Sequence, residues 1–274
     1  MHIFITFAST GLEDVGKRIE EEAKLAHFFT EFYIYNEKDL SKELLSSPTF
    51  QEKRGFGLYS WKSDIILQTL EKANEGDIIV YLDAGCVINA NNKWENLVNE
   101  LNGKDILTFL IHQRNYMWVR KNVFDYYSTS IPYNWKEMFQ CGANAIVVRK
   151  SPVSVKFISE WRNIMINRLD LCGDTPEEEL SQEDPRFIKN RYDQTILTAL
   201  VYKYYPTGKV KLLWEHFEGK DILSKQAFIA ARKRAGRNER DAYTLRRELM
   251  RIIRTNIIYP FYTFLIRHKY NLPM

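Results

Sequence analysis

The chain has 274 residues, of which 45% are hydrophobic and 14% aromatic, and this predicts a globular protein with a sizeable core. No apolar run reaches the roughly 20 residues of a membrane-spanning helix, and because the opening MHIFITFAST has no basic leader and only a short apolar run, we do not expect a signal peptide. Three cysteines (Cys86, Cys141 and Cys172) are odd in number and have no zinc-type spacing. They argue against a disulfide framework, so we expect a cytoplasmic protein.

The formal net charge of +4 is unevenly distributed along the chain. Residues 225–274 contain 12 Lys and Arg against 3 Asp and Glu, a balance of +9, which leaves −5 for residues 1–224. The sequence therefore predicts an acidic main domain over 1–224 and a basic carboxyl-terminal tail over 225–274.

Strand-like and helix-like patterns alternate from the amino terminus. In the first half, the patterns predict strands over 2–9, 31–36 and 78–82, helices over 13–29 and 63–74, and a polar loop over 37–57. In the second half, they predict strands over 105–112, 142–150 and 210–219, helices over 154–169 and 190–205, and an acidic surface loop over 172–187. This alternation predicts an α/β fold with helices covering a sheet.

The strand over 78–82 is continuously apolar and is followed at once by Asp83, Ala84 and Gly85. A carboxylate at the carboxyl end of a buried strand lies where open α/β sheets bind their ligands. The two small residues leave room for a bulky group to approach the backbone. Asp83 can equally open a turn, and this stretch alone leaves both interpretations open.

The turn Asp83-Ala84-Gly85 resembles the D-x-D turn of nucleotide-sugar glycosyltransferases of the GT-A fold, with glycine in place of the second carboxylate. Three later stretches follow in the order of glycosyltransferase family 8, a retaining branch: QCGANAIVVRKSPVSVKFISEW (140–161), RYDQTILTAL (191–200) and EHFEGKD (215–221). The last lacks the Pro-Trp that follows the family's His-x-Gly-x-x-Lys motif. RGFGLYSWKSDIILQTL (54–70) resembles transferases of bacterial capsule and lipopolysaccharide loci. The resemblance covers roughly residues 1–225.

The resemblance implies a GT-A-like mixed sheet and transfer of a sugar from a nucleoside diphosphate to a glycan or glycolipid in bacterial surface polysaccharide assembly. A divalent cation, Mn²⁺ or Mg²⁺, would stabilise the leaving diphosphate, with Asp83 and His216 as the implied ligands. His216 can instead be an interfacial histidine beside Trp214. Because Gly85 carries no carboxylate, the sequence leaves metal dependence open.

Cationic side chains are the alternative stabilisers of the diphosphate. Arg54, Lys62 and Lys220 are the candidates, and solvated surface charges are the alternative interpretation. Asn144 is expected either to contact the donor sugar or to form a turn.

Asp193 and Gln194 are the expected catalytic residues. A retaining transfer needs a polar group beneath the anomeric carbon, where positive charge develops. The alternative is an N-capping Asp with a solvent-facing Gln. An inverting reaction also stays open, because an inverting enzyme needs a carboxylate base and the acidic loop contains Asp174, Glu177, Glu178 and Glu179.

The basic tail mixes Arg with Leu, Ile, Phe and Tyr at partly helical spacing, which predicts an amphipathic helix on an anionic membrane surface. Packing on the main domain or an oligomer contact are alternatives, and no nucleic-acid-binding motif accompanies the charge.

Two other functions compete with sugar transfer. A nucleotidyltransferase needs a Gly-rich loop after the first strand, of which FASTGLEDVGKR is a poor version. A non-catalytic nucleotide-sugar-binding or membrane-associated module would suit the missing second carboxylate.

Overall fold

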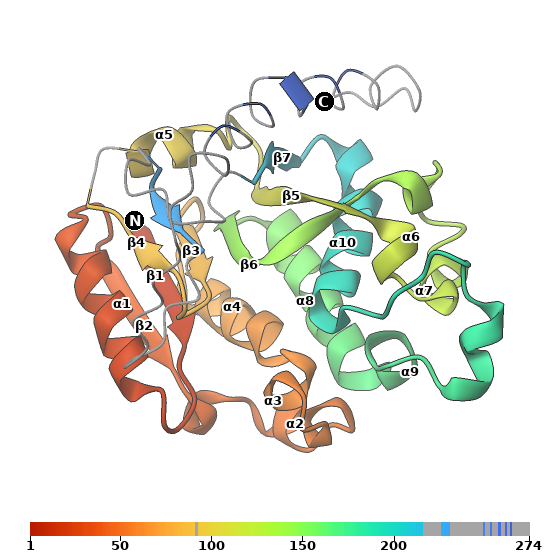
Figure 1. The fold of residues 1–274 in the computed structure, drawn as a ribbon. Coiled ribbons are helices and arrows are strands. Elements are labelled where there is room, and N and C mark those ends of the chain that lie inside the picture. The colour runs from red at the N-terminus through yellow and green to blue at the C-terminus, as the bar shows by residue number, and fades with distance from the viewer. Residues whose placement is uncertain are drawn as a thin grey trace.

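The computed structural model describes residues 1–90, 93–215 and 226–230, together with Leu249, Ile253, Ile257, Ile258, Phe261 and Phe264. A six-stranded sheet in the order β2-β1-β3-β6-β5-β7 forms its centre (Figure 1). Its strands are β1 (His2–Phe7), β2 (Glu31–Tyr35), β3 (Ile78–Leu82), β5 (Ile106–Arg114), β6 (Phe139–Arg149) and β7 (Val210–Trp214). A separate two-stranded sheet pairs β4 (Val87–Ile88) with β8 (Phe228–Ile229).

The main sheet is mixed, as expected from the resemblance. β1 runs parallel to β2 and β3, β5 runs parallel to β7, and β6 is antiparallel to both of its neighbours. The antiparallel register pairs Leu82 of β3 with Ala145 of β6. Beyond this pair the Asp83 N–H donates to the Asn144 carbonyl at 2.9 Å. The predicted α/β class with a mixed sheet is confirmed.

Helices cover both faces of the sheet (Figure 1). One face packs against α4 (Trp61–Lys72), α8 (Pro152–Asn167) and α10 (Tyr192–Tyr204), and the other against α1 (Glu13–Leu25) and α5 (Lys93–Asn99). All five residues of β3 are buried. A strand covered on both faces has no water-facing side, which explains its unbroken apolar sequence.

Short helices replace much of the loop that the sequence predicts over 37–57. They are η1 (Glu37–Asp39), α2 (Lys42–Leu45), η2 (Thr49–Gln51) and α3 (Gly55–Leu58). Two begin with a side-chain cap, in which Asn36 accepts from the Lys38 N–H and Ser41 accepts from the Leu44 N–H. Such caps satisfy the first N–H groups of a helical turn, so polar sequence here favours short helices.

The remaining helices surround the sheet outside these layers. They are α6 (Asn115–Trp118), η3 (Trp135–Glu137), α7 (Lys121–Tyr126), α9 (Leu169–Cys172), η4 (Glu177–Gln182) and η5 (Tyr205–Thr207). The predicted acidic loop contains η4 and is otherwise irregular.

Residues beyond position 224 contribute to the core. Ala227 and Phe228 are buried in the hydrophobic cluster that includes Trp94 and Phe109, and Phe228 pairs with Ile88. The domain boundary at 224/225 stays a prediction. Within the described parts of the chain, no helix has the length and apolar character to cross a membrane.

Candidate active site around Lys62

Three elements meet at the carboxyl end of β3, and a buried lysine joins them. Lys62, in the first turn of α4, places Nζ 3.2 Å from Asp83 Oδ1 and 3.1 Å from Asp193 Oδ2. The same ammonium donates to the Ala143 carbonyl at 2.9 Å. Only 5% of the Lys62 side chain is exposed, so three oxygens replace its hydration.

An unusual turn precedes α4. Residues 55–59 all have φ between +53° and +77°, the left-handed region. Gly55 and Gly57 adopt it freely, but Phe56, Leu58 and Tyr59 each do so at a cost of about 1–2 kcal/mol. The turn brings the Tyr59 ring to 5.1 Å from the Lys62 nitrogen. Backbone strain is thus concentrated beside the buried lysine, as is common at functional sites.

Burial and neighbouring charges shift the pKa values of the site's ionisable groups. Burial alone lowers the pKa of Lys62, but attraction from Asp193 and Asp83 outweighs it and raises the pKa, so the lysine stays charged. Burial raises the pKa of Asp193 to about 6, although Lys62 opposes this rise. The Tyr81 hydroxyl donates to Asp83 Oδ1 at 2.5 Å, and burial raises the pKa of Tyr81 well above its usual value. With both carboxyls ionised, the group carries a net charge of −1.

A second ion pair fixes the turn that follows Asp83. Arg18 on α1 donates to the Ala84 carbonyl at 2.6 Å and the Cys86 carbonyl at 2.9 Å, and also binds Glu22 at 2.8 Å. Glu22 accepts from the Ile88 N–H at 2.9 Å. Sequence analysis missed Arg18, although its spacing of four residues from Glu22 marks a helix-surface ion pair.

Gln194 is anchored by a chain of buried amides. Its Nε2 donates to Gln140 Oε1 at 2.8 Å, Gln140 donates to Asn115 Oδ1 at 2.9 Å, and Asn115 donates to the Trp135 carbonyl at 2.7 Å. Gln140 and Asn115 are fully buried. Gln194 therefore does not simply face solvent, and its Oε1 is the atom that this chain leaves for another partner. Gln140 opens the stretch 140–161 but no local pattern marks it as functional, and Asn115 lies in none of the motifs.

Asp193 does not act as the helix cap. The N-cap of α10 is Arg191, which makes no capping bond, and Asp193 lies inside the first turn. Its carboxylate is directed to Lys62 instead. The capping alternative considered for the sequence is excluded.

The other predicted donor-binding residues lie around this centre. Asn144, on β6 beside Asp83, is partly exposed. Arg54 is exposed and its guanidinium lies 5.4 Å from the ring of Tyr192, the residue before Asp193. Ala84 and Gly85 form the turn held by Arg18. His216 and Lys220 lie outside the described residues.

The described residues do not by themselves fit a divalent cation. Nowhere among them do three or more His, Cys, Asp or Glu side chains gather as a metal-binding group. At the turn, Asp83 offers the one carboxylate, Gly85 offers none, and Lys62 lies 3.2 Å from Asp83. The Asp83 and His216 pair stays a prediction, since His216 is outside the described part.

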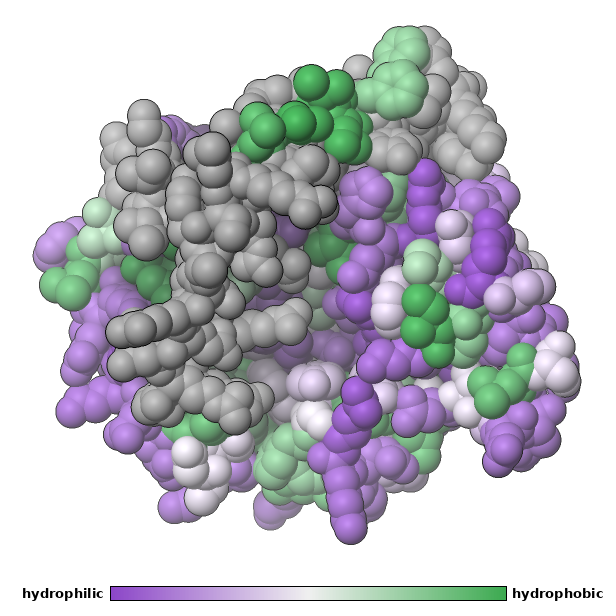
Figure 2. Space-filling model, viewed as in Figure 1, coloured by the Kyte–Doolittle hydropathy of each residue, from purple (hydrophilic) through white to green (hydrophobic). Residues whose placement is uncertain are grey.

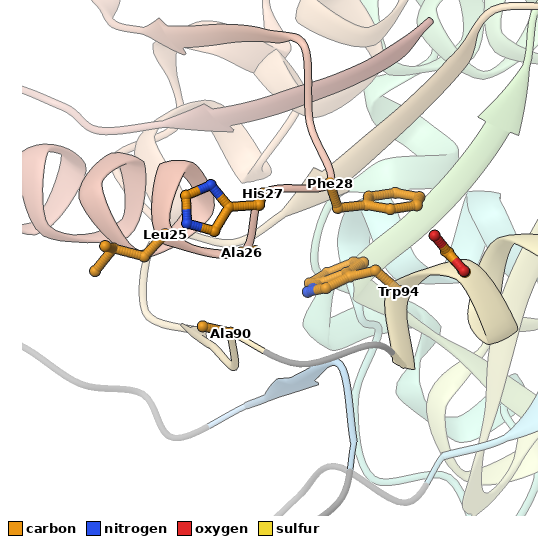
Figure 3. A pocket seen from close by; sticks show the side chains of 7 residues that line it. Leu25, Ala26, His27, Phe28, Ala90 and Trp94 are labelled. Atoms are coloured by element: carbon orange, nitrogen blue, oxygen red, sulfur yellow. The ribbon is translucent and has the colours of Figure 1, made fainter.

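A cavity of about 190 Å³ lies at the opposite end of the sheet. It is lined by Leu25, Ala26, His27, Phe28, Ala90, Trp94 and Glu95, and Figure 3 shows the Phe28 ring facing the Trp94 ring. Phe28 also stacks on His2, which begins β1. Since β1 and β3 are parallel, this cavity lies at the amino end of the sheet and Asp83 at the carboxyl end.

Comparison with known proteins gives likenesses in structure only. No protein-family model matches the chain, and no curated protein does. A glycosyltransferase involved in glycosylation of the major capsid of PBCV-1 is 12% identical, over 83% of this chain and 92% of that chain, with TM-score 0.44. The galactosyltransferase LgtC, in complex with donor and acceptor sugar analogues, is 13% identical over 92% and 95%, with TM-score 0.46. Mouse xyloside xylosyltransferase 1 is 11% identical over 80% and 87%, with TM-score 0.42.

The raised pKa of Asp193 predicts a pH dependence of stability. Between about pH 4 and 6 the unfolded state has released the Asp193 proton and the folded state still holds it, so the free energy of unfolding falls as pH rises. Over these two pH units the free energy of unfolding falls by about 3 kcal/mol at most. Urea unfolding of wild type and Asp193→Asn across this range should show the wild type losing stability relative to the variant. Parallel curves would contradict the prediction.

Proposed function

We propose that this chain is a glycosyltransferase that moves a sugar from a nucleoside-diphosphate donor to a glycan or glycolipid acceptor. The observation that supports this most is the meeting of Lys62, Asp83 and Asp193 at the carboxyl end of β3, with Gln194 beside them. These residues come from separate motifs that resemble one enzyme class. Their meeting point is the edge at which open α/β sheets bind ligands.

Each part of the donor has a candidate partner in this arrangement. The diphosphate needs positive charge, and the exposed Arg54 beside the start of α10 can supply it. The sugar needs hydrogen-bonding groups, and Asn144, within β6, lies beside Asp83 at the carboxyl end of β3. Lys220, expected at the same diphosphate, belongs to the proposal on sequence grounds alone.

We assign Gln194 the position beneath the anomeric carbon. In the reaction the bond from this carbon to the diphosphate oxygen breaks, and its electrons leave with the diphosphate. The acceptor hydroxyl oxygen bonds to the same carbon and its proton passes to the departing phosphate. Positive charge on the sugar is stabilised by Gln194 Oε1 and by Asp193 when ionised. The bond to the buried Gln140 holds the amide in place before the reaction, so its dipole needs no reorientation as charge develops.

One observation disfavours the nucleotidyltransferase alternative. A phosphate-binding loop after β1 would need free backbone N–H groups. The Thr10 N–H instead donates to Glu37 at 2.6 Å, and the Gly11 N–H donates to Glu13 at 2.9 Å. Two carboxylates occupy the position where phosphate oxygens would bind.

The carboxyl-terminal tail supports a lipid-linked acceptor in bacterial surface polysaccharide assembly. Leu249, Ile253 and Phe261 are helical and, with Ile257, follow one another at intervals of four residues. Leu249 and Phe261 are 57% exposed and Ile257 is 63% exposed. Figure 2 shows apolar side chains along the top of the view. An apolar face on a strongly basic segment suits an anionic membrane surface.

Proton NMR of nucleotide-sugar hydrolysis tests the function. We expect sugars of one nucleotide class, among uridine, guanosine and cytidine diphosphosugars, to be hydrolysed, with the first-formed sugar retaining the donor's anomeric configuration. Gln194→Ala should lower turnover by about 10²-fold, because it removes an oriented dipole that acts at the transition state, and should leave nucleotide affinity nearly unchanged. Gln182→Ala, at an exposed glutamine of η4, is the matched control.

Two outcomes would contradict this proposal in different ways. If no nucleotide sugar is bound or hydrolysed, the chain is not a nucleotide-sugar transferase. If the product is inverted and Gln194→Ala is as active as wild type, the assignment of Gln194 is wrong and a base in the acidic loop is favoured.

Vesicle flotation tests the membrane proposal. We expect the wild type to bind vesicles that contain anionic phospholipid and to dissociate as salt rises. Replacing Leu249, Ile257 and Phe261 by Gln should release the protein, because the apolar face is lost while every basic residue remains. Gln at Leu180 and Ile188, two exposed apolar residues of the main domain, is the control. Unchanged binding of the triple variant would contradict the proposal, and a change from oligomer to monomer would favour an oligomer contact. These substitutions avoid deleting the buried Phe228.

A further inference from the structure

Oxygen atoms and aromatic rings surround the Lys62 ammonium. Oxygens of Asp83, Asp193 and the Ala143 carbonyl lie within 3.2 Å of it. The rings of Tyr59 and Trp61 lie 5.1 and 5.6 Å away, and that of Tyr81 lies 5.9 Å away. Aromatic faces attract a cation most where water is excluded, so the rings add to the hold of the carboxylates.

The two carboxylates depend on this ammonium. Both are within ion-pair distance of one nitrogen atom, which places them close together in a region where Asp193 is buried. Carboxylates held this close together in such a region repel one another, and a cation between them offsets the repulsion. Lys62 is that cation among the described residues.

A divalent ion would meet a poor site here. In the turn, its only carboxylate ligand would be Asp83, which already accepts bonds from Lys62 and Tyr81. Gly85 offers no second carboxylate. The nearby ammonium would also repel it, since like charges a few ångströms apart in a partly buried site interact strongly.

Building on the proposed function, we propose that Lys62 is the resident counter-cation of Asp83 and Asp193, so that the free site needs no divalent ion and binds one only weakly. Lys62 then neutralises part of the charge of the two carboxylates, as a metal ion does when two carboxylates bind it. A divalent ion must first displace the ammonium from Asp83.

Mn²⁺ binding in the absence of nucleotide tests this, by electron paramagnetic resonance and calorimetry. We expect no saturation of the wild type below about 1 mM Mn²⁺, as for weak oxygen sites. Lys62→Met should bind at least about tenfold more tightly, because it frees two neighbouring carboxylates for the ion. Lys62→Arg keeps the charge and should stay as weak as wild type. Adding Asp83→Asn to Lys62→Met should abolish the gain.

Tight Mn²⁺ binding by the wild type would overturn the proposal and favour Asp83 and His216 as ligands; this result needs no variant to fold. Equal affinity of folded Lys62→Met and wild type would overturn it as well. Because the readout is metal binding without donor, either failure leaves the proposed sugar transfer standing. Conversely, loss of nucleotide-sugar hydrolysis would reject the transferase without affecting the metal result.

Discussion

A buried ammonium joins two elements that follow one another in the sequence, α4 and β3, to the distant helix α10. Lys62 begins α4, Asp83 follows β3 and Asp193 lies in the first turn of α10, and their ion pairs fix how these elements meet. A buried charge is tolerated only when it is paired, and removing one partner of such a pair typically costs about 3–5 kcal/mol. The geometry of the candidate active site therefore depends on Lys62, which contacts both carboxylates.

The surroundings make this arrangement rigid. Arg18 fixes the turn after Asp83 through two carbonyls, and the buried Gln140 fixes Gln194. Fixed dipoles cost no reorganisation when charge develops during a reaction, which is the main source of electrostatic catalysis. The left-handed turn at residues 55–59 adds strain that the rest of the fold must offset, and it lies directly before Lys62. Rigidity and strain thus occur at the same place as the buried charges.

Local patterns in the sequence predicted the elements better than their contacts. The unbroken apolar run of β3 and the helical spacing of α10 are local properties, and each was placed nearly as found. Lys62, Asp83 and Asp193 were all named, but as parts of separate motifs, and Lys62 was expected at the diphosphate. Its ion pair with Asp193 joins residues more than a hundred positions apart, which no periodicity encodes. Arg18 was missed for the same reason, since its partners are backbone carbonyls of a distant turn.

A crystal structure with a non-hydrolysable nucleotide sugar is the most direct test of the central claim. The account predicts that the sugar lies at the carboxyl end of β3, with its anomeric carbon next to Gln194 Oε1 and the diphosphate within reach of Arg54. Lys62 should still contact both Asp83 and Asp193. A donor bound at the opposite end of the sheet, in the cavity beside Phe28 and Trp94, would contradict it.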